Sequence, residues 1–149
     1  MKTSEKLSGR LKEIVNALPL KRGMRILEIG CGPGVMAREI ANRFEDIYVL
    51  AIDRSAKAIQ QAKKNSGSQI ETGKLSFVQI AVEHFVIDKS EPPFDLAVAI
   101  RVGAFDGRHP EIEQQALKNV AAALTRKGKF FIDGGNPLRE ISLKRFHSK

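Results

Sequence analysis

A short glycine-rich segment, Gly30-Cys31-Gly32-Pro33-Gly34, is the part of this sequence best suited to hold a nucleotide-like ligand. Gly30 and Gly32 permit backbone angles that a Cβ would forbid, and they let a ligand approach the main chain closely. Pro33 suits the first turn of a helix, where its missing N–H would be unpaired anyway, so we expect a helix to begin there. The free backbone N–H groups at this helix start can receive the negative end of a ligand.

An acidic residue follows this segment at the spacing that nucleotide-binding sheets use. Residues 25–30 are apolar and rich in β-branched side chains, which is typical of a buried parallel strand, and Tyr48 to Ile52 predicts the next strand, ending in Asp53. An acid about 20 residues beyond a glycine-rich turn, at the carboxyl end of the second strand, can bind ribose hydroxyls. Alternatively, Asp53 caps the following helix; both roles are compatible if Ser55 forms the cap.

The spacing of the glycines discriminates between cofactors. The dinucleotide fingerprint is G-x-G-x-x-G, and here Val35 holds the place of its third glycine. Together with Glu28, the segment instead resembles the first motif of class I S-adenosylmethionine-dependent methyltransferases, E/D-x-G-x-G-x-G, and the resemblance extends over residues 24–133. It implies S-adenosylmethionine as cofactor, with the loop around its methionine part. The cofactor-binding residues we predict are Glu28, Gly30, Cys31, Gly32, Gly34, Asp53, Arg54, Ala81, Val82, Glu83 and Ile100.

The sequence departs from the family's pattern after the third predicted strand, residues 75–80. In the family this strand commonly ends in an acidic residue followed by a small one, and both contact the adenine. Here Ala81 stands where the acid is expected. The adenine contact then falls to the backbone of Ala81 and Val82 or to Glu83, which is equally compatible with a surface carboxylate.

The densest group of polar side chains follows the fourth predicted strand, in the loop of residues 101–110. The carboxyl ends of parallel strands border the ligand crevice of open α/β sheets, so these side chains can take part in chemistry. The alternative is a turn followed by a helix start, with the charges in solvent. The candidates are His109 as general base, with Asp106 and His84 behind it, and Arg101 and Arg108 for an acidic substrate.

Helical and strand patterns alternate along the chain, which predicts one α/β domain over residues 1–149. We expect a Rossmann-like, doubly wound, mostly parallel sheet of order 3-2-1-4-5, with the cofactor between the first and fourth strands. In the segment 1–20 we expect a helix over residues 4–18, stopped by Pro19. We expect a loop from Ser66 to Ser68. The other expected helices span residues 33–44, 55–65 and 110–124, and the strands residues 25–30, 48–52, 75–80, 94–100 and 129–133.

The tail, residues 134–149, is short for this family. A complete class I methyltransferase adds a helix and an antiparallel hairpin here, and so few residues cannot build both. We therefore expect most or all of the hairpin to be absent, which would expose the edge of the fifth strand. Either a homodimer or residues Leu138 to Phe146 would then cover this edge.

Composition and charge indicate the cellular location of the protein and the kinds of partner it has. The 149 residues are 42% hydrophobic, no run approaches the roughly 20 apolar residues of a membrane span, and the N-terminus is charged rather than signal-like, so we expect a cytoplasmic protein without a membrane partner. The single cysteine, Cys31, cannot form an internal disulfide and favours a packing role over a nucleophilic one. The net charge of +8 is scattered without interleaved aromatic residues, which favours solvated faces over nucleic-acid binding. We expect no metal.

The predicted function is transfer of a methyl group from S-adenosylmethionine. A sulfonium methyl is already electrophilic, so in-line displacement mainly requires a nucleophile held in position, and the sequence does not name the acceptor. A small molecule, a protein side chain and RNA all remain possible. The alternatives are a non-catalytic S-adenosylmethionine-binding module, or a subunit completed by a partner, and a NAD-dependent oxidoreductase, which the missing third glycine disfavours.

Overall fold

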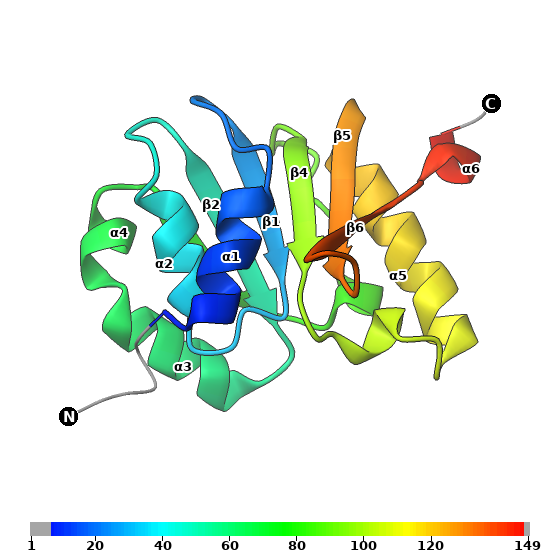
Figure 1. Ribbon diagram of the computed structural model, residues 1–149, viewed down its shortest axis with the longest axis horizontal. Coiled ribbons are helices and arrows are strands. Elements are labelled where there is room, and N and C mark those ends of the chain that lie inside the picture. The colour runs from blue at the N-terminus through cyan, green and yellow to red at the C-terminus, as the bar shows by residue number, and fades with distance from the viewer. Residues whose placement is uncertain (1–6, 148–149) are drawn as a thin grey trace.

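The computed structural model describes residues 7–147, and its centre is a six-stranded sheet of order β3-β2-β1-β4-β5-β6 (Figure 1). The first five strands are parallel, and β6 is antiparallel to β5. This confirms the expected fold class and the order of the first five strands. The strands are β1 (Arg25–Ile29), β2 (Tyr48–Asp53), β3 (Leu75–Gln79), β4 (Phe94–Ala99), β5 (Leu124–Asp133) and β6 (Leu138–Ile141).

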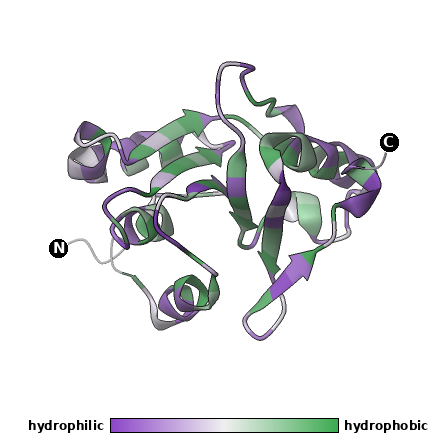
Figure 2. Cartoon of the chain, turned by 90° about the horizontal axis from the view of Figure 1, so that it is seen from above, coloured by the Kyte–Doolittle hydropathy of each residue, from purple (hydrophilic) through white to green (hydrophobic). Residues whose placement is uncertain are grey.

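Helices cover both faces of the sheet (Figure 1). One face packs against the apolar sides of the first three helices, and the other packs mainly against α5. Figure 2 shows hydrophobic residues along the central strands and alternating stripes on the helices, as expected for amphipathic elements. The helices are α1 (Gly9–Ala17), α2 (Val35–Ala41), α3 (Ala56–Asn65), α4 (Gly67–Glu71), α5 (Pro110–Ala123) and α6 (Lys144–His147). Within residues 7–147, no helix is long and apolar enough to cross a membrane.

Two expectations about the first half of the chain were wrong in detail. Helix α2 begins at Val35 rather than Pro33, because Gly34 precedes it in the left-handed conformation at φ +89°. The expected loop at residues 66–68 instead opens α4. The buried Ser66 starts this turn: its carbonyl accepts from the Ile70 N–H, and its hydroxyl accepts from Arg38 Nη1 at 3.0 Å. The start of the N-terminal helix predicted over residues 4–18 lies partly outside the described residues.

The C-terminal expectation needs the largest correction. Strand β5 starts at Leu124, not at residue 129, because Leu124 already pairs with Phe94 on β4, before an irregularity in the pairing. The tail then forms β6, which pairs with β5 from Asp133↔Leu138 to Phe130↔Ile141. One antiparallel strand of the hairpin is therefore present, and the tail does cover the β5 edge. The homodimer stays a prediction, which light scattering can check.

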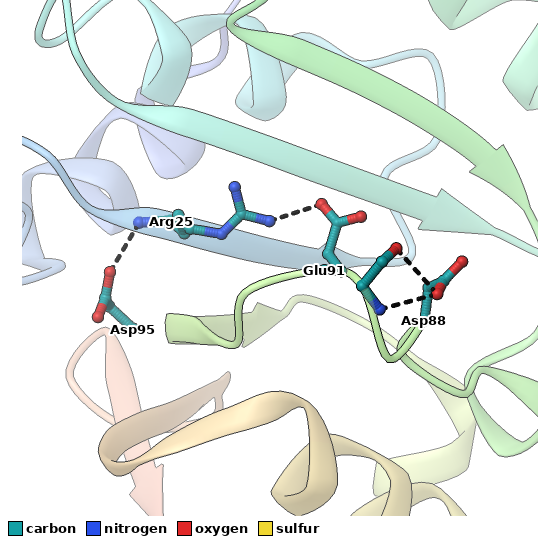
Figure 3. A network of polar contacts seen from close by, with 5 residues as sticks. Arg25, Asp88, Glu91 and Asp95 are labelled. Atoms are coloured by element: carbon teal, nitrogen blue, oxygen red, sulfur yellow. Dashed lines mark hydrogen bonds and ion pairs between the residues drawn. The ribbon is translucent and has the colours of Figure 1, made fainter.

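The amino ends of β1 and β4 are joined by a polar network around Arg25 (Figure 3). The Arg25 backbone N–H donates to Asp95 Oδ2 at 2.9 Å, and Arg25 Nη2 donates to Glu91 Oε2 at 2.6 Å. The guanidinium also stacks over the rings of Tyr48 and Phe94. These contacts hold together the end of the sheet opposite the strand carboxyl ends, so Asp95 has a structural role.

Candidate active site

The loop after β1 is shaped by three glycines in left-handed conformations. Gly30, Gly32 and Gly34 have φ values of +75°, +54° and +89°. The N–H groups of Gly30 and Cys31 both donate to the Ile52 carbonyl, at 2.8 and 3.0 Å. These bonds turn the chain sharply at the end of β1 and fix the loop to the end of β2. The sequence pattern of glycines therefore has a conformational cause at each position.

The three glycines differ in what a Cβ added to each of them would contact. A Cβ on Gly30 would lie 2.6 Å from Val102 Cγ2, and a Cβ on Gly34 would lie within 3.2 Å of Arg38 Nη1, Phe77 Cζ and Ala62 Cβ. A Cβ on Gly32 would meet nothing within 4 Å. Gly30 and Gly34 thus allow close packing of the protein itself. Gly32 borders open space, which a ligand needs if it is to approach the backbone of the loop.

Asp53 ties the glycine loop to the start of α3. Its Oδ2 accepts from the Gly32 N–H at 2.8 Å, and its Oδ1 accepts from the Ser55 N–H at 2.9 Å. Ser55 is the helix cap, because its Oγ accepts from the Ala58 N–H at 3.1 Å. This confirms that Ser55 forms the cap, while binding of ribose hydroxyls by Asp53 stays a prediction. Each carboxylate oxygen keeps a lone pair that a ligand hydroxyl can use.

A cavity of about 530 Å³ opens at the carboxyl ends of β1, β2, β3 and β4. Its volume lies in the range typical of small-molecule and cofactor sites. The backbone on one side is fixed, because the buried Asn119 of α5 donates from Nδ2 to the Val82 carbonyl at 3.0 Å. The predicted residues that line the cavity are Gly30, Asp53, Arg54, Ala81, Val82, Glu83, Arg101, Arg108 and His109. The cavity lining does not include Glu28, Cys31, Gly32, Gly34 or Ile100.

Sequence reasoning missed part of this lining. Ile80, Val102, Gly103, Ala104 and Ile112 also border the cavity. Three of them, Val102 to Ala104, lie in the turn after β4, between Arg101 and Arg108. Their small or apolar side chains carry no chemical signal of their own. Only their place after a strand end could have identified them.

Glu28 is a buried carboxyl group on β1, with 3% of its surface exposed. Burial, and then the nearby Asp53 carboxylate, raise the pKa of Glu28 to about 8, although Arg38 acts in the opposite direction. Its Oε1 has no hydrogen-bond partner among the described residues. Since buried polar atoms are almost always paired, this acceptor is available to a ligand's donor.

Cys31 behaves as a small apolar residue. It is buried in the core cluster that faces the first three helices. Burial raises the pKa of its thiol far above the usual value, and the neighbouring carboxylates of Glu28 and Asp53 raise it further. A thiol that does not ionise is a poor nucleophile, which supports the packing role.

The two candidate substrate arginines have different surroundings. Arg108 is held by Asp106, with Nη2 at 2.6 Å and Nε at 2.8 Å from Oδ2, and this pairing holds the pKa of Asp106 below its usual range. The Arg101 guanidinium has no hydrogen bond or ion pair within residues 7–147. Its backbone N–H donates to Asp133 Oδ1 at 3.1 Å, and its φ is +57°. Arg101 is therefore the arginine available to a ligand.

The remaining candidates for catalysis are simpler to place. His109 is exposed on the rim of the cavity, just before α5, and its side chain makes no capping bond. Asp106 is engaged by Arg108, and His84 lies outside the cavity lining. Over the described part of the chain, no group of three His, Cys, Asp or Glu residues could hold a metal ion.

A doubly wound sheet with a glycine loop after β1 and an acid ending β2 defines a nucleotide-type cofactor-binding domain. Residues 26–128 match the family described as "Methyltransferase domain", and the chain belongs to this family of class I S-adenosylmethionine-dependent methyltransferases.

Individual relatives agree with this assignment. The chain is 31% identical to an O-methyltransferase of Aspergillus nomiae over 97% of its own length and 64% of that protein. It is 33% identical to a tRNA1(Val) (adenine(37)-N6)-methyltransferase of Pedobacter heparinus over 71% of its length and 50% of that protein. A solved S-adenosylmethionine-dependent methyltransferase from Thiobacillus denitrificans, in complex with S-adenosyl-L-homocysteine, superposes with a TM-score of 0.65 at 23% identity, covering 86% of this chain and 48% of that one. The chain thus spans about half to two thirds of these proteins.

Proposed function

We propose that this chain binds S-adenosylmethionine in the cavity beside the glycine loop and transfers its methyl group to an acceptor. The observation that supports this most is the convergence of Gly30, Asp53 and the segment 81–83 on one cavity of suitable volume. The relatives' names include an O-methyltransferase and a tRNA adenine methyltransferase. Relatedness therefore leaves the acceptor open.

The residues present fit this cofactor. The open space over Gly32 admits a ligand against the loop, and the unpaired Oε1 of Glu28 suits the ammonium of the cofactor's methionine part. Asp53 suits the ribose hydroxyls, since its oxygens keep free lone pairs. Arg54 and residues 81–83 then border the base. When bound, the cofactor supplies an electrophilic methyl group.

The chain's own contribution is to orient an acceptor and to remove a proton where the acceptor carries one. We assign the second role to His109, which borders the cavity and whose side chain makes no capping hydrogen bond. Holding the nucleophile at near-attack distance supplies most of the acceleration for such a displacement. A catalytic triad is unnecessary for this chemistry.

A second candidate is a cofactor-binding subunit that a partner completes. It is favoured by Ala81, which replaces the family's usual acid, and by the single antiparallel strand after β5. We place the protein in a reducing compartment such as the cytoplasm, since its one cysteine is free and buried. Methyl transfer to any acceptor by the isolated chain would exclude the need for a partner.

Asp53→Ala is expected to weaken S-adenosylhomocysteine binding by about 1–3 kcal/mol, because it removes the acceptor for the ribose hydroxyls and frees the Gly32 N–H. Titration calorimetry measures this change. Asp53→Asn is the matched variant: it keeps one acceptor oxygen and should lose less. Unchanged affinity in both variants would reduce Asp53 to a structural link between the loop and α3.

A further inference from the structure

A second cavity, of about 640 Å³, lies beside the first at the carboxyl ends of β4 and β5. The two cavities share Arg101, Val102, Gly103 and Arg108 in their linings. A molecule in the second cavity is therefore next to a cofactor in the first. The second cavity also has the volume of a small-molecule site.

The floor of the second cavity is a row of residues across three strands. Ala99 on β4 pairs with Ile132 on β5, and Ile132 pairs with Arg139 on β6. Cross-strand partners present their side chains on the same face of a sheet, so Arg139 lies beside this apolar floor. Phe105, which packs edge-to-face on Phe130 at 5.1 Å, adds an apolar wall.

Among the described residues, three arginines and three acids line this cavity, but two of the acids are already engaged by other groups. Asp106 is bound by Arg108, and Asp133 accepts from the Arg101 N–H and lies 3.6 Å from the Arg10 guanidinium. Within residues 7–147, the guanidinium groups of Arg101 and Arg139 have no hydrogen bond or ion pair. Glu113 is the one acid of the lining without an ion pair there. Two unpaired arginines against one unpaired carboxylate leave the cavity suited to an anion.

Arg101 is also held in an unusual backbone conformation. Its φ of +57° is the only positive value at a non-glycine residue in the described chain. Such a conformation is strained for a residue with a Cβ, and here the Arg101 N–H donates to Asp133 Oδ1. Because backbone strain is concentrated at binding sites, the strained backbone of Arg101 between the two cavities indicates a residue positioned to bind a ligand.

We propose that the second cavity binds a small organic acid, with its apolar body against Phe105, Ala99 and Ile132 and its carboxylate at Arg101 and Arg139. That this acid is the methyl acceptor rests on the proposed function. RNA is disfavoured because Phe105 is the only aromatic residue of the lining among the described residues, so the cavity offers no series of rings on which successive bases could stack.

Benzoate is the probe, since it combines a carboxylate with an apolar ring. We expect benzoate to bind the full chain in nuclear magnetic resonance titrations, with shifts in residues that line the second cavity. Arg101→Gln and Arg139→Gln should each weaken binding about tenfold, as loss of a charged hydrogen bond does. Benzamide, the neutral analogue, should bind correspondingly less well. Arg126→Gln, an exposed charge on β5 outside both cavity linings, is the matched control and should change nothing.

S-adenosylhomocysteine titrated into the same variants separates this proposal from the proposed function. Arg139 does not line the first cavity, so Arg139→Gln should keep full S-adenosylhomocysteine affinity while losing benzoate. Benzoate binding that is absent, or equal in all variants, overturns the acid site and leaves the proposed function intact. Binding of a short RNA oligonucleotide that is lost in both arginine variants would also overturn it. Benzoate binding without S-adenosylhomocysteine binding would support the acid site and contradict the proposed function.

Discussion

Gly30→Ala is expected to lower the free energy of unfolding by about 2–5 kcal/mol and to abolish S-adenosylhomocysteine binding. The added Cβ would lie 2.6 Å from Val102 Cγ2, and Val is a stiff, β-branched side chain that cannot rotate away freely. The substitution also forces a residue with a Cβ to φ +75°. Overpacking contributes about 1–3 kcal/mol and left-handed strain about 1–2 kcal/mol, and together they give the expected size. Urea denaturation followed by circular dichroism measures the change.

Gly32→Ala is the matched comparison, because φ is again positive but the new Cβ would meet nothing within 4 Å. We expect a stability loss of only about 1–2 kcal/mol, from strain alone. Cofactor binding should nevertheless fall sharply, since the methyl group fills the space over the loop. The double variant Gly30→Ala, Val102→Ala should recover part of the stability lost in Gly30→Ala. Equal stability losses at positions 30 and 32, with cofactor affinity retained at 32, would contradict this picture of the loop.

Glu28→Gln is expected to stabilise the protein at alkaline pH by about 3–5 kcal/mol. The pKa of Glu28 is raised from 4.5 to about 8 by burial. Below pH 4.5 the group is neutral in both the folded and the unfolded protein and costs nothing. As pH rises from 4.5 to 8 only the unfolded chain ionises, so stability falls, and above 8 the loss is complete. Gln stays neutral throughout and avoids this loss.

The measurement is the difference in unfolding free energy between the variant and the parent protein at several pH values. The difference should be small near pH 5, should grow steadily and should level off above pH 8. Glu111→Gln, at an exposed position at the start of α5, is the control and should stay within about 0.5 kcal/mol of the parent. A difference independent of pH would mean that Glu28 is not buried as a neutral acid.

The sequence predicted the glycine turn after β1 and the place of Asp53 at the end of β2, because these signals are local. The glycine spacing, Glu28 and the acid at position 53 each lie at or next to the end of a strand whose apolar run is clear in the sequence. The cap at Ser55 was predictable for the same reason. The start of α2 was misplaced by two residues, because left-handed glycines at every second position from Gly30 to Gly34 extend the turn past Pro33.

The substrate side depends on contacts between distant parts of the chain. Sequence treated Arg101 and Arg108 alike, and only tertiary contacts with Asp133 and Asp106 distinguish them. The sequence did not predict a ligand role for Arg139, because β6 is four residues long and its position depends on pairing with β5. Such short strands have little pattern of their own, so their partners cannot be found by periodicity.

Titration calorimetry of the full chain with S-adenosylhomocysteine, and separately with NAD, tests the central claim most directly. The geometry of the glycine loop and of Asp53 predicts one S-adenosylhomocysteine site per chain, weakened by Asp53→Ala, and no binding of NAD. Binding of NAD without binding of S-adenosylhomocysteine would contradict the account.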